Sequence, residues 1–277
     1  MRYKLVADSS ANVFAMSGVD YASVPMKIIT TQAEYVDDTA LDVAAMVDEI
    51  KVTKGKSGTS CPNMQDWLDA FAGADRIFAV TITSNLSGAH ASCVQAAADY
   101  EAENPGAKVC VIDSLSAGPE LGLILEKLKA WINEGREFEQ MATDIAEYQQ
   151  HTHLSFSLES LTNLARNGRV SPAVAKIAGV LGIRVVGVAS DHGTLEPLHK
   201  VRGEKKALET LFEDMKDRGY KGGIVRIANC FNQDAANFLE SLILGQFPNA
   251  TVQHEPCSAL CSFYAERGGL LVGYEDI

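Results

Sequence analysis

A regular alternation of short apolar stretches with helical patterns in residues 1–150 most constrains the fold. Stretches rich in β-branched residues, typical of strands, occupy residues 4–10, 24–30, 76–83 and 107–113. Apolar residues recur at helical spacing in residues 41–51, 63–73, 89–103 and 120–135. Strands that alternate with helices predict an α/β domain with a mainly parallel sheet and helices on both faces.

Residues 151–277 have shorter connections and a clearer alternation of polar and apolar residues. Strand patterns occur at residues 153–159, 183–190, 222–230, 251–256 and 269–275. Helical patterns occur at residues 171–182, 203–219 and 234–247, and residues 194–201 lead into the second of these. The pattern predicts an α+β domain with a mixed or antiparallel sheet. We therefore expect two domains, residues 1–150 and residues 151–277.

Charge and apolar content exclude several classes of protein. The net charge of −12 disfavours nucleic acid and anionic membranes as main partners, because both attract basic patches. No apolar run approaches the roughly 20 residues of a membrane span, and the first ten residues do not resemble a signal peptide. The six cysteines are irregularly spaced, which favours reduced thiols over a disulfide framework. We expect a cytoplasmic protein.

Two polar turns lead into predicted helices. One contains Thr59 and Ser60, just before Pro62. The other, TSNLSG at residues 83–88, supplies Ser84, Asn85, Ser87 and Gly88. In parallel sheets ligands bind beyond the carboxyl ends of strands, and helix N-termini favour anions through their N–H groups and dipole.

The absence of cations from both turns indicates the kind of anion. A phosphate loop normally combines several glycines with a lysine, whereas two or three neutral donors can hold a carboxylate. The turns therefore predict a site for the carboxylate of an apolar ligand. The alternative that Ser84 or Ser87 only caps a helix remains open at this point.

Two alternatives, a hydrolase and a metal site, also follow from the residue types. A hydrolase would use Ser84 or Ser87 as its nucleophile, but the chain lacks a G-x-S-x-G elbow. Structural zinc normally requires paired short spacings. Possible metal ligands occur at irregular positions: His151, His153, His254, Cys257 and Cys261. We therefore expect neither catalysis nor a metal or other cofactor.

Arg169 and Arg202 each lie beside a glycine, in ARNGRVS and HKVRGEKK. The planar guanidinium of arginine binds phosphate oxygens in pairs, so both are candidates for contact with a phosphate or an acidic partner. The alternative is a solvated basic rim that includes Lys205 and Lys206.

An ordered set of segments resembles the DegV family of bacterial fatty-acid-binding proteins. These segments are VADSSANV, GTSCPNM, TSNLSGAHASC, VIDSLSAG, LESLTNLARNGRVS, TLEPLHKVRGEKKAL and RGGLLVGY, which together span nearly the whole chain. The resemblance implies two α/β domains that enclose a long-chain fatty acid in an apolar tunnel. It also implies that Thr59 and Ser87 hold the carboxylate, with Ser60, Ser84, Asn85 and Gly88 as neighbours.

The resemblance further implies a role in phospholipid synthesis. Family members present the bound acid to a separate ATP-dependent kinase that forms acyl phosphate, and the arginines proposed for that step match Arg169 and Arg202. The chain departs from the family pattern at Asn12, Cys61 and Asn63. Tyr264 also stands where a family histidine is expected near the carboxylate. A lipid sensor without a kinase partner remains a further alternative.

Overall fold

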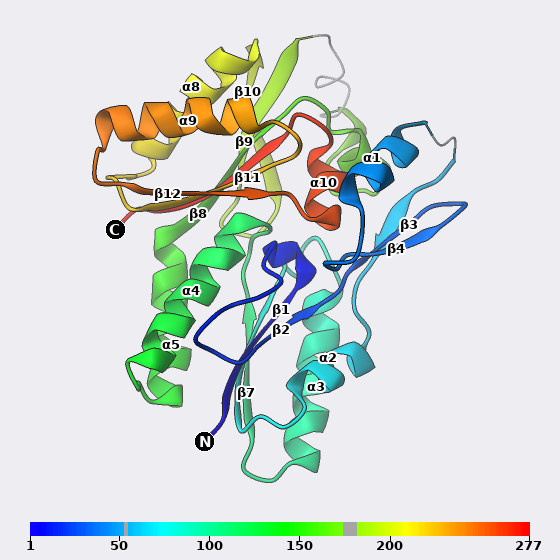
Figure 1. The fold of residues 1–277 in the computed structure, drawn as a ribbon, viewed down its shortest axis with the longest axis vertical. Coiled ribbons are helices and arrows are strands. Elements are labelled where there is room, and N and C mark those ends of the chain that lie inside the picture. Colours follow the sequence, from blue (N-terminus) through cyan, green and yellow to red (C-terminus); the bar gives the residue numbers. More distant parts are fainter. Residues whose placement is uncertain (53–54, 174–181) are drawn as a thin grey trace.

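The first sheet contains four parallel strands in the order β2-β1-β6-β7, with helices on both faces (Figure 1). The computed structural model describes residues 1–52, 55–173 and 182–277. The strands are β1 (Tyr3–Asp8), β2 (Tyr21–Val24), β6 (Arg76–Thr81) and β7 (Lys108–Asp113).

Alternate side chains of these strands enter two separate cores. Leu5 and Phe78 pack with the helices α4 (Pro119–Asn133) and α5 (Phe138–Tyr148). On the other face, Val6 and Ile77 pack with α2 (Met64–Phe71) and α3 (Ala89–Glu103). Both faces are buried, which explains why these strands are almost continuously apolar.

The second sheet contains six strands in the order β10-β9-β8-β13-β11-β12. They are β8 (Thr152–Leu158), β9 (Ile183–Ala189), β10 (Leu195–Arg202), β11 (Ile224–Asn229), β12 (Thr251–Pro256) and β13 (Leu270–Glu275). Among neighbouring described strands of this sheet, only β11 and β12 pair in parallel, and α9 (Gln233–Gln246) joins them. The helices α8 (Glu204–Asp217) and α9 cover one face, while α4 packs against the other (Figure 1).

A small antiparallel sheet, β4-β3-β5, connects the two halves of the chain. Its strands are β3 (Lys27–Ile29), β4 (Glu34–Val36) and β5 (Gly58–Ser60). Ile28 is buried between α1 (Val43–Val52), which supplies Met46, and α10 (Ala259–Ala265), which supplies Phe263. The last helix of the chain is therefore part of a core formed mainly by the first half.

The predicted fold class is confirmed: an N-terminal parallel sheet with helices precedes a mixed sheet with helices. The second sheet begins at Thr152, close to the boundary predicted from sequence. The division into two domains stays a prediction, because α4 and α10 each pack across it. Most of the helix predicted at residues 171–182 lies outside the described residues.

Several local predictions were wrong. The strand predicted at residues 24–30 is broken at Pro25, so that β2 and β3 belong to different sheets. Thr59 lies in β5 rather than in a turn. The helices α5, α6 (Thr162–Arg166) and α10 were not predicted.

Gly273 allows α4 to pack directly on β13. A Cβ atom there would lie 2.6 Å from the backbone nitrogen of Glu120 and 2.7 Å from the carbonyl carbon of Pro119. Backbone atoms cannot rotate away, so we expect Gly273→Ala to lower the free energy of unfolding by about 1–3 kcal/mol or more. Denaturant unfolding measures this change.

Gly245→Ala is the matched control for that substitution. Gly245 lies in α9, and its Cβ atom would have nothing within 4 Å. Alanine is the better helix former by up to about 1 kcal/mol, so this variant should be as stable as the wild type or more stable. Equal effects of the two substitutions would contradict the proposed contact between α4 and β13.

Candidate functional site

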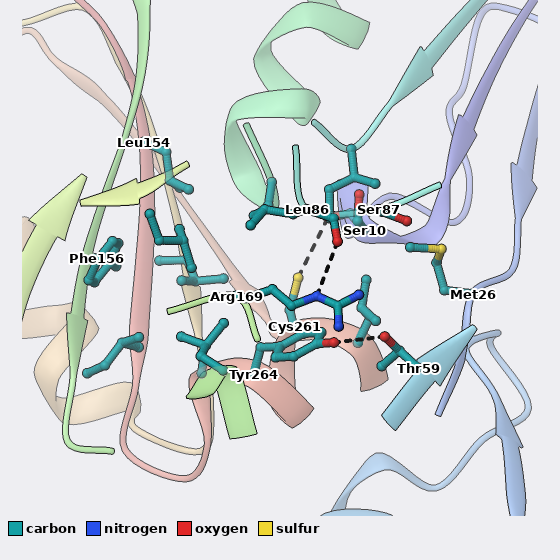
Figure 2. Close-up of a pocket in the computed structure, with 18 residues that line it drawn as sticks. Ser10, Met26, Thr59, Leu86, Ser87, Leu154, Phe156, Arg169, Cys261 and Tyr264 are labelled. Atoms are coloured by element: carbon teal, nitrogen blue, oxygen red, sulfur yellow. Dashed lines mark hydrogen bonds between the residues drawn. The ribbon is translucent and has the colours of Figure 1, made fainter. Parts of the chain in front are cut away.

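A cavity lies between the two halves of the chain, with about 690 Å³ of empty space that partly opens to solvent. Most of the residues that line it are apolar: Met26, Ile82, Leu86, Ala117, Leu154, Phe156, Leu158, Leu164, Leu195, Leu260, Ala265 and Leu271. The remaining lining residues are Ser10, Thr59, Ser87, Arg169, Cys261 and Tyr264 (Figure 2).

The polar groups lie away from the β8 side of the cavity. In Figure 2, Thr59 and Ser87 lie on the opposite side of the pocket from Phe156 and Leu154. Thr59 is positioned by pairing with Ile28 in the small sheet, and its Oγ1 lies 2.8 Å from the hydroxyl of Tyr264 on α10. The cavity thus has the hydroxyls of Thr59 and Ser87 on one side, its polar end, and apolar side chains of β8 on the other.

The segment after β5 lies close to the start of α3, and this brings Thr59 and Ser87 to the same cavity. Gly88 is the N-cap residue of α3, and a Cβ atom there would lie 3.4 Å from Sγ of Cys61. The segment that follows β5 therefore packs closely against the start of α3. Ser87 Oγ accepts the N–H of Ala89 at 3.2 Å, a local bond that orients the hydroxyl beside the helix N-terminus.

Arg169 places a cation in the wall of the cavity. Its Nε donates to the carbonyl of Leu86 at 3.2 Å, and Nη1 donates to the carbonyl of Asn167 at 2.6 Å. The guanidinium carbon lies 5.9 Å from the centre of the Tyr264 ring, within cation–π range. These contacts hold Arg169 beside the phenol that contacts Thr59.

Tyr264 remains a hydrogen-bond donor near neutral pH. Burial raises the pKa of its phenol, while Thr59 and the charge of Arg169 oppose the rise. A protonated phenol can donate to a carboxylate without titrating in that range. Tyr264 can therefore contribute to anion binding, although a histidine is expected at this position of the family pattern.

Residues of the first half hold the N-terminus of α10 and so position Tyr264. The carboxylate of Asp37 accepts the N–H groups of Ala259 at 2.7 Å and Leu260 at 3.2 Å. Asn12, in a left-handed conformation with φ of 61°, donates to the carbonyl of Pro256 at 2.8 Å and accepts the N–H of Ser258. A carboxylate at position 12 could not make the first of these bonds.

Five residues predicted for the site do not line the cavity: Ser60, Ser84, Asn85, Gly88 and Arg202. Ser60 Oγ donates to the carbonyl of Cys61 at 3.3 Å, and the backbone N–H of exposed Ser84 donates to Asp113 at 3.1 Å. The side-chain amide of Asn85 donates to the carbonyl of His192 at 2.6 Å. Arg202 is exposed at the end of β10.

Sequence reasoning missed Ser10, although it lies within the VADSSANV segment. Its hydroxyl donates to the carboxylate of Asp8, which also accepts the N–H of Ile82 at 2.8 Å. Asp8 is fully buried, and this burial raises the pKa of its carboxyl to about 6. Asp8 therefore orients one of the polar groups of the cavity.

The possible metal ligands identified in the sequence have other contacts. His151 and His153 both contact the carboxylate of Asp276, at 2.8 and 2.9 Å. Cys261 lines the cavity, and its Sγ lies 3.6 Å from the carbonyl of Ser10. Within residues 1–52, 55–173 and 182–277, no three possible ligands form a metal-binding group, and no helix could span a membrane.

Comparisons with known proteins agree on one family. A sequence model of the DegV family of uncharacterised proteins matches residues 2–275. A DegV domain-containing protein from Streptococcus pneumoniae is 41% identical over 279 aligned residues, covering 99% of each chain.

Two solved structures resemble the chain throughout. A DegV family protein from Eubacterium eligens, loaded with heptadecanoic acid, is 44% identical with a TM-score of 0.98, covering 99% of this chain and 100% of its own. The Fatty Acid Kinase (Fak) B3 protein of S. pneumoniae, loaded with linoleic acid, is 41% identical. Its TM-score is 0.98 and the match covers 100% of both chains.

Asp8 makes a testable contribution to the pH dependence of stability. Its pKa is raised from 3.8 to about 6 in the folded protein, so the unfolded state ionises first as the pH rises. The contribution of Asp8 to the free energy of unfolding should therefore fall by about 2 kcal/mol between pH 4 and pH 6. The stability deficit of Asp8→Asn relative to wild type should shrink over the same interval.

Urea unfolding of wild type and Asp8→Asn across this pH range measures the change. Asp99 is an exposed residue of α3, so Asp99→Asn provides the control. If the difference in the free energy of unfolding between wild type and Asp8→Asn does not vary with pH, the raised pKa of Asp8 is contradicted.

Proposed function

Because this chain belongs to the DegV family, we propose that it binds a long-chain fatty acid in the cavity between its two halves. One observation carries this proposal: an apolar cavity has its hydroxyl groups and its cation away from the β8 side. That arrangement complements a molecule with a long apolar chain and one acidic end. Thr59, Ser87 and Tyr264 would hold the carboxylate.

Simple energy estimates support different roles for the apolar walls and for the hydroxyls of the cavity. Burying an acyl chain yields about 0.8 kcal/mol per methylene, so about 14 methylenes supply roughly 11 kcal/mol before ordering costs. Each hydrogen bond to a charged group adds only about 1.5–3 kcal/mol. The apolar walls would therefore set affinity and chain preference, while the hydroxyls fix the orientation of the acid.

We also propose that the bound carboxylate is presented to a separate ATP-dependent kinase for acyl-phosphate formation. The relation to a protein named for fatty acid kinase supports a kinase partner. Arg169 lies beside the polar end of the cavity and could balance the added charge of a phosphate. Arg202 is exposed and could contact the partner.

The cavity offers little support for the hydrolase alternative. Ser87 is the one serine of the TSNLSG turn that lines it, and no histidine, aspartate or glutamate is among the described lining residues. A serine nucleophile needs an adjacent base to become reactive. The protein would then be a non-catalytic binding component.

Organic extraction of the purified protein followed by mass spectrometry tests the proposed ligand. We expect close to one long-chain fatty acid per chain. An extract without fatty acid, from protein that also fails to bind added palmitate, would reject the proposal.

Two hydroxyl substitutions test the carboxylate site. Ser87→Ala and Thr59→Val should each weaken palmitate binding by about 1.5–3 kcal/mol, the contribution of one hydrogen bond to a charged group. Ser84→Ala is the matched control, because Ser84 belongs to the same turn but does not line the cavity. Titration with palmitate measures all three, and unchanged affinity in both cavity variants would place the carboxylate elsewhere.

The two arginines are expected to act after binding. Arg169→Ala and Arg202→Ala should leave palmitate affinity within about threefold, because neutral donors hold the resting acid, and should impair kinase-dependent acyl-phosphate formation. Each variant requires both measurements. Loss of palmitate binding in folded Arg169→Ala would assign this residue to the carboxylate itself, and full product formation in both variants would remove the arginines from the kinase step.

A further inference from the structure

A second, polar cleft lies next to the cavity, with about 1030 Å³ of empty space. Its lining includes Asp113, Glu120, Gln149, Thr152, His153 and Ser190. Three further lining residues, Leu115, Gln150 and Asp191, are exposed, so the cleft opens to solvent. Neither the carboxylate site nor the proposed kinase contact uses this cleft.

Three separate segments border both the cleft and the cavity. Residues 113–120 border the cleft through Asp113 and Glu120 and the cavity through Ala117. Residues 189–195 border the cleft at Ser190 and the cavity at Leu195. Residues 152–158 of β8 border the cleft at Thr152 and the cavity at Phe156. Three segments, far apart in the sequence, each run from the cleft to the cavity. The cleft and the cavity therefore adjoin.

Leu154 lies between the cleft and the cavity. Alternate residues of a strand share a face, and on one face of β8 Thr152 borders the cleft while Phe156 and Leu158 border the cavity. Leu154 lies between them, about 7 Å along the strand from Thr152, and it alone among the described residues lines both hollows. In Figure 2, Leu154 lies across the pocket from Thr59, where the chain terminus of a bound acid would point.

Hydrogen-bonding groups lie directly beyond Leu154. Thr152 Oγ1 donates to the carboxyl of Glu120 at 2.8 Å, and Ser116 donates to the same carboxyl. Glu120 is only 5% exposed, and burial raises its pKa to about 7. The lone pairs of the Thr152 hydroxyl and of the carboxyl oxygens can accept a further hydrogen bond.

We infer that the cleft is a second arm of the ligand site, which takes the far end of acyl chains that carry a hydroxyl group there. Thr152 and Glu120 would accept the hydrogen bond of that hydroxyl, and Leu154 would turn aside to admit it. The inference rests on the proposed binding of fatty acids. If the cavity instead ended in a closed apolar wall, an unpartnered hydroxyl would weaken binding by about tenfold to hundredfold.

The test compares ω-hydroxy fatty acids of about 12 to 18 carbons with the unsubstituted acids of equal length. At each length, the measured quantity is the dissociation constant of the ω-hydroxy acid divided by that of the unsubstituted acid. For the wild type we expect a ratio below about ten at the best chain length. A ratio above about ten at every length would overturn the inference, and failure to bind the unsubstituted acids would reject the proposed function together with it.

Two variants locate the effect at Leu154. Leu154→Phe enlarges the side chain between the hollows and should raise the ratio by about fivefold or more. Leu158→Phe is the matched control, because Leu158 lies on the same face of β8 but does not border the cleft, and it should leave the ratio unchanged. Equal ratios in the two variants would overturn the inference. Circular dichroism establishes that both variants are folded.

Discussion

The hydrogen bonds that fix the N-terminus of α10 support the whole binding site. Asp37 and Asn12 come from the first half of the chain, yet they bind backbone groups at residues 256–260 of the last quarter. Through these bonds α10 closes one side of the cavity with Leu260, Cys261 and Ala265. The same helix brings Tyr264 to Thr59.

Buried charge is placed around the cavity rather than inside its apolar part. Asp8 lies behind Ser10 and Asp37 lies at the start of α10, and each carboxylate accepts backbone N–H groups that offset the cost of burial. Both carboxyls have raised pKa values because burial outweighs those bonds. The acyl chain would meet only apolar walls, while the carboxylate would meet neutral donors held in place from behind.

Local patterns predicted much of the first half of the fold. The strands β6 and β7 and the helices that follow them have long, uninterrupted periodicity, so their own residues determine them. The three residues of β5 carry no such pattern, because Thr59 is extended only through its pairing with Ile28. Pro25 was a visible signal for a strand break, since proline cannot donate to a ladder.

The site was only partly predictable from the sequence, because several of its residues are also placed by contacts rather than by a local pattern. Thr59 and Ser87 belong to polar segments of the sequence and could be identified as candidates, whereas Leu154, Phe156 and Leu158 look like ordinary core residues. The role of Ser10 depends on Asp8, and the role of Asn12 depends on Pro256 and Ser258. The contacts of Asn12 join residues far apart in the sequence and leave no local pattern.

A crystal structure of the protein with bound palmitate tests the central claim most directly. The account predicts a carboxylate within about 3 Å of the hydroxyls of Thr59 and Ser87, with the chain directed toward Leu154. A carboxylate at the Leu154 end, or palmitate bound outside the cavity, would contradict it.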